Sequence, residues 1–133
     1  MKDYLKKDFR DQNGIASFVI NDEKTKKVTD FYKYMPFPNY KDDDNKQSIL
    51  KKGDKNILAY QFKKFIGYKK KVLEVGCGTG QLSIYFSLGT NNEIIAFDPT
   101  IESLDLAKNF ADKNQISNIN FVNADIFDDV LTN

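Results

Sequence analysis

Three glycines at alternate positions follow a short aliphatic run, and this stretch constrains the fold more than any other part of the chain. The run covers residues 72–75, the glycines are Gly76, Gly78 and Gly80, and apolar residues at helical spacing begin again at Leu82. This order predicts a strand, a tight turn and a helix. Because alternate glycines remove every Cβ from one side of the turn, the backbone can adopt positive φ and a flat ligand can lie against it.

The spacing of the glycines narrows the class of ligand. A dinucleotide-binding pattern, G-x-G-x-x-G, would need its third glycine at position 81, where this chain has Gln81, and this disfavours a nicotinamide cofactor. A phosphate-binding P-loop would need Gly-Lys-Ser or Gly-Lys-Thr five residues after Gly76. Residues 81–83 are Gln-Leu-Ser, which excludes that interpretation.

The composition excludes several further classes of function. The chain has 133 residues, 41% of them hydrophobic, which is enough for one core. Twenty basic and nineteen acidic residues leave a net charge of +1, so no overall field recruits nucleic acid or an anionic membrane. The absence of histidine excludes His-based metal sites and His-driven acid–base chemistry, so any general base must be a carboxylate, a tyrosine or a lysine, or lie elsewhere. We expect no metal and assign no catalytic residue.

The single cysteine, Cys77, lies inside the glycine-rich turn and cannot form an internal disulfide. Without a histidine to activate it, we predict a small buried filler with no catalytic role. The longest apolar runs, such as residues 15–20, are too short for a signal-peptide core or a spanning helix. We therefore expect a cytoplasmic protein.

Two more strands and one crossover helix are predicted after the glycines. Residues 93–97 form a nearly continuous apolar run, typical of a parallel strand buried on both faces, and residues 119–122 form a shorter one. Between them, residues 101–114 have apolar side chains at helical spacing. A strand, helix, strand order of this kind predicts a parallel α/β sheet.

The second strand ends at Asp98 and Pro99, and Asp98 is a candidate ligand residue. It lies 18 positions after Gly80, where an acidic side chain can accept hydrogen bonds from both hydroxyls of a ribose. The alternative is that Asp98 only begins the turn into the next helix, with Thr100 as its N-cap. Both roles are compatible.

Residues 74–80, Glu-Val-Gly-Cys-Gly-Thr-Gly, resemble motif I of the class I S-adenosylmethionine-dependent methyltransferases, and the resemblance extends over residues 71–128. It implies a Rossmann-like sheet of strand order 3-2-1-4-5-7-6, of which this chain would supply strands 1, 2 and 3. It also implies S-adenosyl-L-methionine as the cofactor. The cofactor-binding residues that it implies are Glu74, Gly76, Cys77, Gly78, Thr79, Gly80, Asp98, Pro99, Asp125 and Ile126.

The resemblance also implies individual roles for the acidic residues. Glu74 would order the loop by accepting backbone hydrogen bonds, or reach the methionine amino group through water. Asp125 would meet the adenine amino group, with Ile126 packed against the ring. An equally weighted alternative is that Asp125 caps a short helix over residues 126–131.

Residues 1–70 are predicted to be a mainly helical N-terminal extension, and residues 71–133 the N-terminal half of the cofactor-binding domain. Within the extension, residues 15–20 could form a strand or pack as coil, and one helix is expected from residue 21 or 22 to residue 34. The aromatic residues between 31 and 40 could form a substrate lid, but packing against a neighbouring element is the favoured role.

A charged loop is expected over residues 41–46 and a second helix over residues 55–66. In that helix, Leu58, Phe62 and Phe65 share one face.

These features together predict a methyltransferase that acts on an unidentified acceptor, in the form of a fragment without the substrate-binding half. We expect this fragment alone to bind the cofactor weakly at best and to be inactive. The alternatives are an NAD-dependent oxidoreductase and a non-catalytic module that binds an adenosine cofactor. The strand at residues 72–75 would lack a neighbour on one side, so we expect the isolated chain to self-associate there. We expect no membrane partner. The sequence gives no evidence for a nucleic acid partner, and the methyl acceptor is left open as a small molecule, a nucleic acid or a protein.

Overall fold

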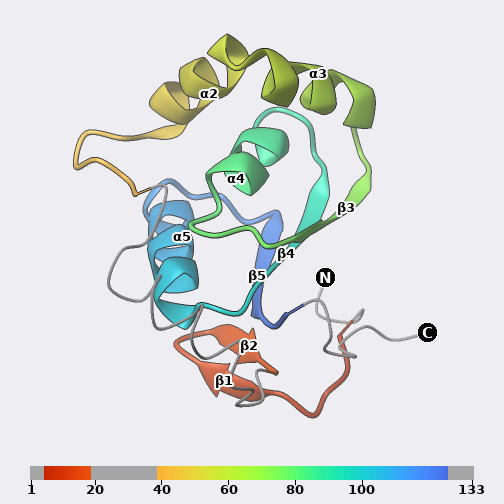
Figure 1. The fold of residues 1–133 in the computed structure, drawn as a ribbon, viewed down its shortest axis with the longest axis vertical. Coiled ribbons are helices and arrows are strands. Elements are labelled where there is room, and N and C mark those ends of the chain that lie inside the picture. The colour runs from red at the N-terminus through yellow and green to blue at the C-terminus, as the bar shows by residue number, and fades with distance from the viewer. Residues whose placement is uncertain (1–4, 19–38, 126–133) are drawn as a thin grey trace.

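The structure is a computed structural model that describes residues 5–18 and 39–125 (Figure 1). It contains one five-stranded sheet in the order β1-β2-β5-β4-β3. The strands are β1 (Arg10–Gln12), β2 (Ile15–Ser17), β3 (Lys71–Val75), β4 (Glu93–Asp98) and β5 (Ile119–Asn123). The helices are α2 (Lys46–Lys55), α3 (Ile57–Ile66), α4 (Gln81–Ser87) and α5 (Ile101–Lys113).

The three predicted strands are confirmed as β3, β4 and β5, which run parallel to one another. Val75 pairs with Phe97, and Asp98 pairs with Asn123, so the three strands end together. The predicted crossover helix is confirmed as α5, and β4 is buried along most of its length. Because parallel strands share one carboxyl edge, the loops after β3, β4 and β5 meet there.

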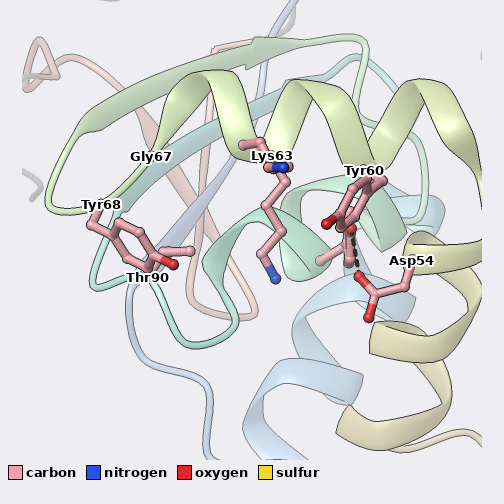
Figure 2. Close-up of a pocket in the computed structure, with 8 residues that line it drawn as sticks. Asp54, Tyr60, Lys63, Gly67, Tyr68 and Thr90 are labelled. Atoms are coloured by element: carbon pink, nitrogen blue, oxygen red, sulfur yellow. Dashed lines mark hydrogen bonds between the residues drawn. The ribbon is translucent and has the colours of Figure 1, made fainter.

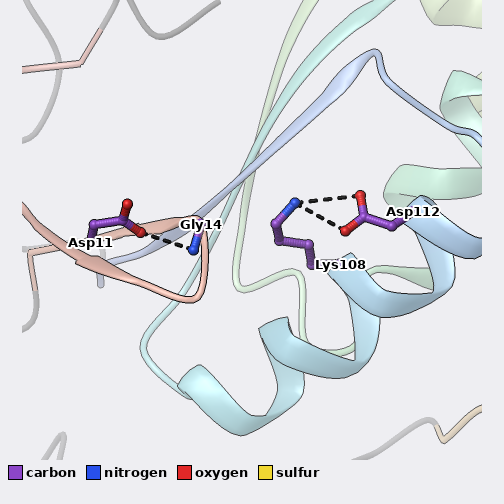
Figure 3. A network of polar contacts seen from close by, with 4 residues as sticks. All are labelled: Asp11, Gly14, Lys108 and Asp112. Carbon is purple, nitrogen blue, oxygen red and sulfur yellow. Dashed lines mark hydrogen bonds and ion pairs between the residues drawn. The ribbon is translucent and has the colours of Figure 1, made fainter.

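The sheet has two strands beyond the three expected, and both come from the first 70 residues. β1 and β2 form an antiparallel hairpin, and β2 pairs in parallel with β5. Of the two alternatives for residues 15–20, strand or coil, the strand is therefore correct at Ile15–Ser17. The Asn13-Gly14 turn has positive φ at both residues, as a two-residue hairpin turn requires. The turn lies against α5, where Lys108 pairs with Asp112 at 3.2 Å (Figure 3).

The helix expected over residues 55–66 is confirmed as α3, and α2 is an additional helix that forms a helical hairpin with it. Asn56 ends α2 and also begins α3, because its side chain accepts a hydrogen bond from the Ala59 N–H at 3.1 Å. Asn45 caps α2 in a reciprocal capping box with Ser48. Hydrophobic periodicity did not predict α2, because the helix is mostly polar and Ile49 is its one fully buried side chain.

The hydrophobic core lies between α4 and the sheet. Residues 83–87 of α4 are all buried, and α2 and α3 lie over this helix on the side away from the sheet (Figure 1). Gly53 allows α2 to approach, since a Cβ there would lie 2.3 Å from the Tyr85 ring. Among the described residues, no helix has the length and apolar content needed to cross a membrane.

Apolar side chains remain exposed on α3 and β3. The predicted face of α3 is turned outward, with Leu58 64%, Phe62 50% and Phe65 89% exposed. In the described part of the chain, β3 is an edge strand, and Leu73 and Val75 are nearly half exposed. The open edge expected at the glycine-motif strand is therefore present in this sheet.

Several predictions lie outside the described residues. These are the helix expected from residue 21 or 22 to residue 34, the aromatic residues between 31 and 38, the position of Ile126 and the helix expected over residues 126–131.

Candidate cofactor site

The glycine-rich loop turns sharply after β3. Gly76, Gly78 and Gly80 have φ values of 78°, 58° and 78°, and the N–H groups of Gly76 and Cys77 both donate to the Phe97 carbonyl at 2.8 Å. A Cβ added at Gly76 would meet no atom within 4 Å. The backbone at Gly76 is therefore open to a ligand, as the alternate glycines predict.

Gly80 differs from Gly76, because protein fills the space beside it. A Cβ at Gly80 would lie 2.8 Å from the Phe121 ring and 2.9 Å from the Ala107 side chain. This glycine allows the start of α4 to pack closely on α5 and β5, and it also supplies the positive φ at which α4 begins. Packing alone thus accounts for glycine at this position.

Asp98 connects the loops that follow β3 and β4. Its Oδ2 accepts a hydrogen bond from the Gly78 N–H and its Oδ1 accepts one from the Thr100 N–H, both at 2.8 Å. The turn-forming role proposed for Asp98 is therefore present. Thr100 is the N-cap residue, but its own side chain makes no capping hydrogen bond. Because each carboxylate oxygen has a second lone pair, Asp98 retains capacity to accept from a ligand.

The end of β5 completes this edge of the sheet. The Asn123 side-chain amide donates to the Asp98 carbonyl at 3.1 Å, and the Ser17 hydroxyl donates to Asn123 Oδ1 at 2.7 Å. The Ala124 N–H also donates to the Asp98 carbonyl. Asp125 follows directly, so the structure places it in the loop beside the one that contains Asp98 and Pro99.

Glu74 links β3 to α4, because its carboxylate accepts a hydrogen bond from the Ser83 hydroxyl. The donor is thus a side chain, whereas the resemblance implied either backbone donors or a water-mediated contact with the methionine amino group. Burial raises the pKa of Glu74, the Ser83 hydrogen bond lowers it, and the negative charge of Asp98 raises it further. A positively charged ligand group beside Glu74 would oppose both effects that raise this pKa and would favour the ionised carboxylate.

Cys77 is a buried member of the hydrophobic core, as predicted. Burial raises the pKa of its thiol well above the ordinary value, and the charges of Asp98 and Glu74 act in the same direction. The thiol therefore stays protonated at neutral pH and is a weak nucleophile.

Tyr40 is the loop contact that sequence analysis missed. Its hydroxyl donates to the Thr79 carbonyl at 2.6 Å, and its ring stacks on Phe110 with the ring centroids 4.4 Å apart. The Gln81 side chain donates to the Asn39 carbonyl beside it. The favoured packing role is thus correct for Tyr40, but only the fold reveals that the ring packs beside the glycine-rich loop.

Metal binding has no candidate centre in residues 5–18 and 39–125. No group of three or more cysteine, aspartate or glutamate side chains is arranged there to hold an ion.

Comparison with solved structures supports the fold assignment. The chain is similar to a putative S-adenosyl-L-methionine-dependent methyltransferase from Methanococcus maripaludis, with 22% identity, a TM-score of 0.50, and coverage of 84% of this chain and 47% of that chain. It is also similar to the [4+2]-cyclase SpnF, with 19% identity, a TM-score of 0.56, and coverage of 76% and 43%. The chain thus spans less than half the length of either protein.

A family profile identifies the chain more directly. The profile of a family described as a methyltransferase domain matches residues 66–132, which is half of the chain. No curated protein gives a significant match. The matched range contains the glycine-rich loop, Asp98 and Asp125. The chain therefore belongs to this family of methyltransferase domains.

Proposed function

We propose that the protein transfers a methyl group from S-adenosyl-L-methionine to an acceptor. The observation that carries this proposal is the shared carboxyl edge of β3, β4 and β5, where an open glycine-rich loop lies beside two acidic loops in a methyltransferase domain. The name of the Methanococcus maripaludis protein supports the choice of cofactor. The division of the chain into residues 71–133 as the cofactor-binding part and residues 1–70 as an extension belongs to the same proposal.

The residues at this edge fit the parts of the proposed cofactor. At Gly76, no side chain separates the main chain from the methionine end of the cofactor. Glu74 provides a negative charge for the amino group of that methionine. Asp98 accepts from the ribose hydroxyls with its second lone pairs, as acidic residues after a second Rossmann strand do. Asp125, with Ile126 after it, is assigned to the adenine.

The backbone and side chains around the loop hold this site in shape. Cys77, Thr79 and Gly80 contribute main chain to the loop, and Pro99 follows Asp98 into the next turn. Tyr40 fixes the Thr79 carbonyl. Because burial raises the pKa of the Tyr40 hydroxyl well above its ordinary value, this hydroxyl stays protonated and continues to donate.

The chemistry requires little from the described residues beyond alignment. When bound, the cofactor supplies an electrophilic methyl group on a sulfonium. The chain's own residues would bind and orient the cofactor, which is one half of the alignment of methyl group and acceptor that this displacement requires. No catalytic base is assigned. Cys77 and Tyr40 are both protonated at neutral pH, and neither fits that role.

Titration of the chain with S-adenosylhomocysteine and with NAD tests the proposed cofactor. We expect calorimetry to detect S-adenosylhomocysteine binding and no NAD binding. Tighter binding of NAD would favour the oxidoreductase alternative, and binding of neither by a chain with native circular dichroism would contradict an adenosine cofactor. The alternative of a non-catalytic binding module would gain support if the protein bound the cofactor but methylated no acceptor in a broad panel.

We also propose that the 133-residue chain self-associates through β3. Its apolar residues Leu73 and Val75 are nearly half exposed on an edge strand, and exposed apolar edges pair with other chains. Light scattering should show a mass that rises with protein concentration. Leu73→Lys should reduce the association, whereas Gln12→Lys on the opposite edge strand β1 should not. A monomer at all concentrations, or equal effects of the two substitutions, would contradict this proposal.

A further inference from the structure

A cavity of about 320 Å³ lies between α3 and α4, away from the glycine-rich loop (Figure 2). Its volume falls at the small end of the range for small-molecule sites, about 300 to 1,000 Å³. Aromatic rings and lysine side chains dominate its lining. Figure 2 shows Tyr68 at one end and Tyr60 at the other, with the Lys63 side chain between them.

One side of the cavity is formed by the buried Tyr85 ring, which is held in a fixed position. Its hydroxyl donates to Asp54 Oδ1 at 2.8 Å, and the α2 backbone at Gly53 lies directly against the ring. Burial and the Asp54 hydrogen bond together raise the pKa of Tyr85 to about 12, so the hydroxyl remains a donor at neutral pH. The cavity therefore has one rigid aromatic wall.

Two lysine ammonium groups adjoin aromatic rings at this cavity. Lys63 Nζ lies 4.4 Å from the centroid of the Tyr85 ring, and Lys64 Nζ lies 5.3 Å from that of Tyr60. Within the part of the chain that the structure describes, neither ammonium has an ion-pair partner at salt-bridge distance. Partial burial lowers the pKa of Lys63, because it disfavours the charged form. An anion beside Lys63 would offset that desolvation.

The lining also fixes the charge and shape of a suitable ligand. Two lysines against Asp54 give a net charge of +1, and the Asp54 carboxylate already accepts from Tyr85. A single negative charge balances this set, whereas a multiply charged phosphate exceeds it. Tyr60 and Tyr68 are partly exposed, at 42% and 71%, so their rings are available to cover a flat apolar body.

The cavity lies at the opposite end of the strands from the proposed cofactor site. Gly67 and Tyr68 precede β3, and Thr90 precedes β4, with the Lys69 N–H donating to the Thr90 carbonyl at 3.0 Å. The glycine-rich loop follows β3. A five-residue strand separates the two ends by about 16 Å, at roughly 3.3 Å for each residue.

We propose that this cavity binds a small planar monoanion of the aromatic carboxylate class, between the Lys63 and Lys64 ammonium groups and the Tyr60, Tyr68 and Tyr85 rings. The lysines bind the carboxylate, and the tyrosine rings cover the planar body. The ligand site is separate from the edge of the sheet assigned to the cofactor.

Benzoate is the probe for a calorimetric titration of the 133-residue chain at neutral pH. We expect a dissociation constant of about 1 mM or tighter, a realistic value for so small a ligand. Benzyl alcohol, which has the ring without the charge, and acetate, which has the charge without the ring, should each bind at least tenfold more weakly. If acetate or inorganic phosphate bound as tightly as benzoate, the proposal that the cavity selects a planar monoanion would be overturned.

Two variants locate the site. Lys63→Met keeps most of the side-chain stem but removes the charge, and it should weaken benzoate at least tenfold. Lys51→Met, at an exposed position of α2 outside the cavity, should bind as the original chain does. Equal binding by folded Lys63→Met would overturn the proposal. Displacement of benzoate by excess S-adenosylhomocysteine would also overturn it, because the two ligands would then share one site.

Discussion

The two ends of β3 and β4 are built from different parts of the chain. At the carboxyl end, main-chain atoms form the surface. Gly76 and Gly78 have positive φ there, and Asp98 accepts hydrogen bonds from main-chain N–H groups. At the amino end, side chains form the surface, and tyrosine rings and the Lys63 ammonium group surround a cavity. Helix α4 runs between the two, and its side chains contribute to both regions through Ser83 and Tyr85.

This difference predicts how the surface at each end changes when a residue is substituted. A backbone surface is defined by absent side chains, so one added methyl group changes its shape while the rest of the fold is preserved. A surface made of side chains depends on how the tyrosine rings and lysine stems pack. Its shape therefore changes when the helix that packs against them moves.

Gly76→Ala is expected to reduce S-adenosylhomocysteine affinity at least 100-fold, about 2.7 kcal/mol. The new Cβ would project into the space that is open beside the loop, where the ligand is proposed to lie. Calorimetry measures this loss, and urea unfolding measures the accompanying strain of alanine at positive φ, about 1 to 2 kcal/mol.

Gly89→Ala is the matched control for that strain. Gly89 has φ of 71° against 78° at Gly76, and a Cβ there also meets nothing within 4 Å, but it lies beyond the other end of α4. The two variants should lose similar stability, and only Gly76→Ala should lose ligand affinity. Equal affinities in the two variants would remove the glycine-rich loop from the site.

Asp98→Ala is expected to weaken S-adenosylhomocysteine by about 1.5 to 3 kcal/mol, the range for hydrogen bonds to a charged group. Glu93→Ala is the control, because Glu93 is exposed at the amino end of the same strand. Stability should fall in Asp98→Ala as well, since the Gly78 and Thr100 N–H groups lose their acceptor. Unchanged affinity in a folded Asp98→Ala variant would leave Asp98 with its turn-forming role alone.

The sequence revealed the carboxyl end because its determinants are local. The three glycines and Glu74 lie within seven consecutive residues, and Asp98 ends the next apolar run, so glycine spacing and the resemblance of residues 74–80 to motif I were enough to predict them as site residues. The amino end has no such pattern. Its cavity combines Asp54, Lys63 and Thr90 from separate helices and a turn, and only the packing of α2 and α3 on α4 brings them together.

The same reason explains which parts of the fold were missed. The three parallel strands have strong apolar runs, but the pairing of β2 with β5 joins residues more than 100 positions apart. Tyr40 likewise contacts Thr79 from 39 positions away. Such contacts depend on the tertiary arrangement, and neither hydrophobic periodicity nor turn chemistry encodes them.

Gly53→Ala tests the support of the amino-end cavity. In an open helix, this change adds up to about 1 kcal/mol of stability. Here the new Cβ would lie 2.3 Å from the Tyr85 ring, so we expect a loss of about 1 to 2 kcal/mol from overpacking. Unfolding by urea measures the change, and Lys51→Ala on the same helix should stay within about 0.5 kcal/mol of the original chain. A stabilised Gly53→Ala variant would show that α2 does not hold Tyr85 in place.

Glu74→Gln should give the smallest change, because glutamine still accepts from the Ser83 hydroxyl. Burial raises the folded pKa of Glu74 above its unfolded value, so the folded state binds the proton more tightly and stability falls as pH rises through that interval. The variant should therefore unfold at higher urea than the original chain at pH 7, and this difference should vanish below about pH 4, where Glu74 is protonated in both states. Glu93→Gln, which removes an exposed carboxylate from β4, is the control and should stay within about 0.5 kcal/mol of the original chain at pH 7. Ligand affinity should change in the opposite direction, because the lost charge faces the proposed amino group of S-adenosylhomocysteine. A Glu74→Gln variant that is less stable at pH 7 and binds the ligand unchanged would contradict both the buried charge and its role in the site.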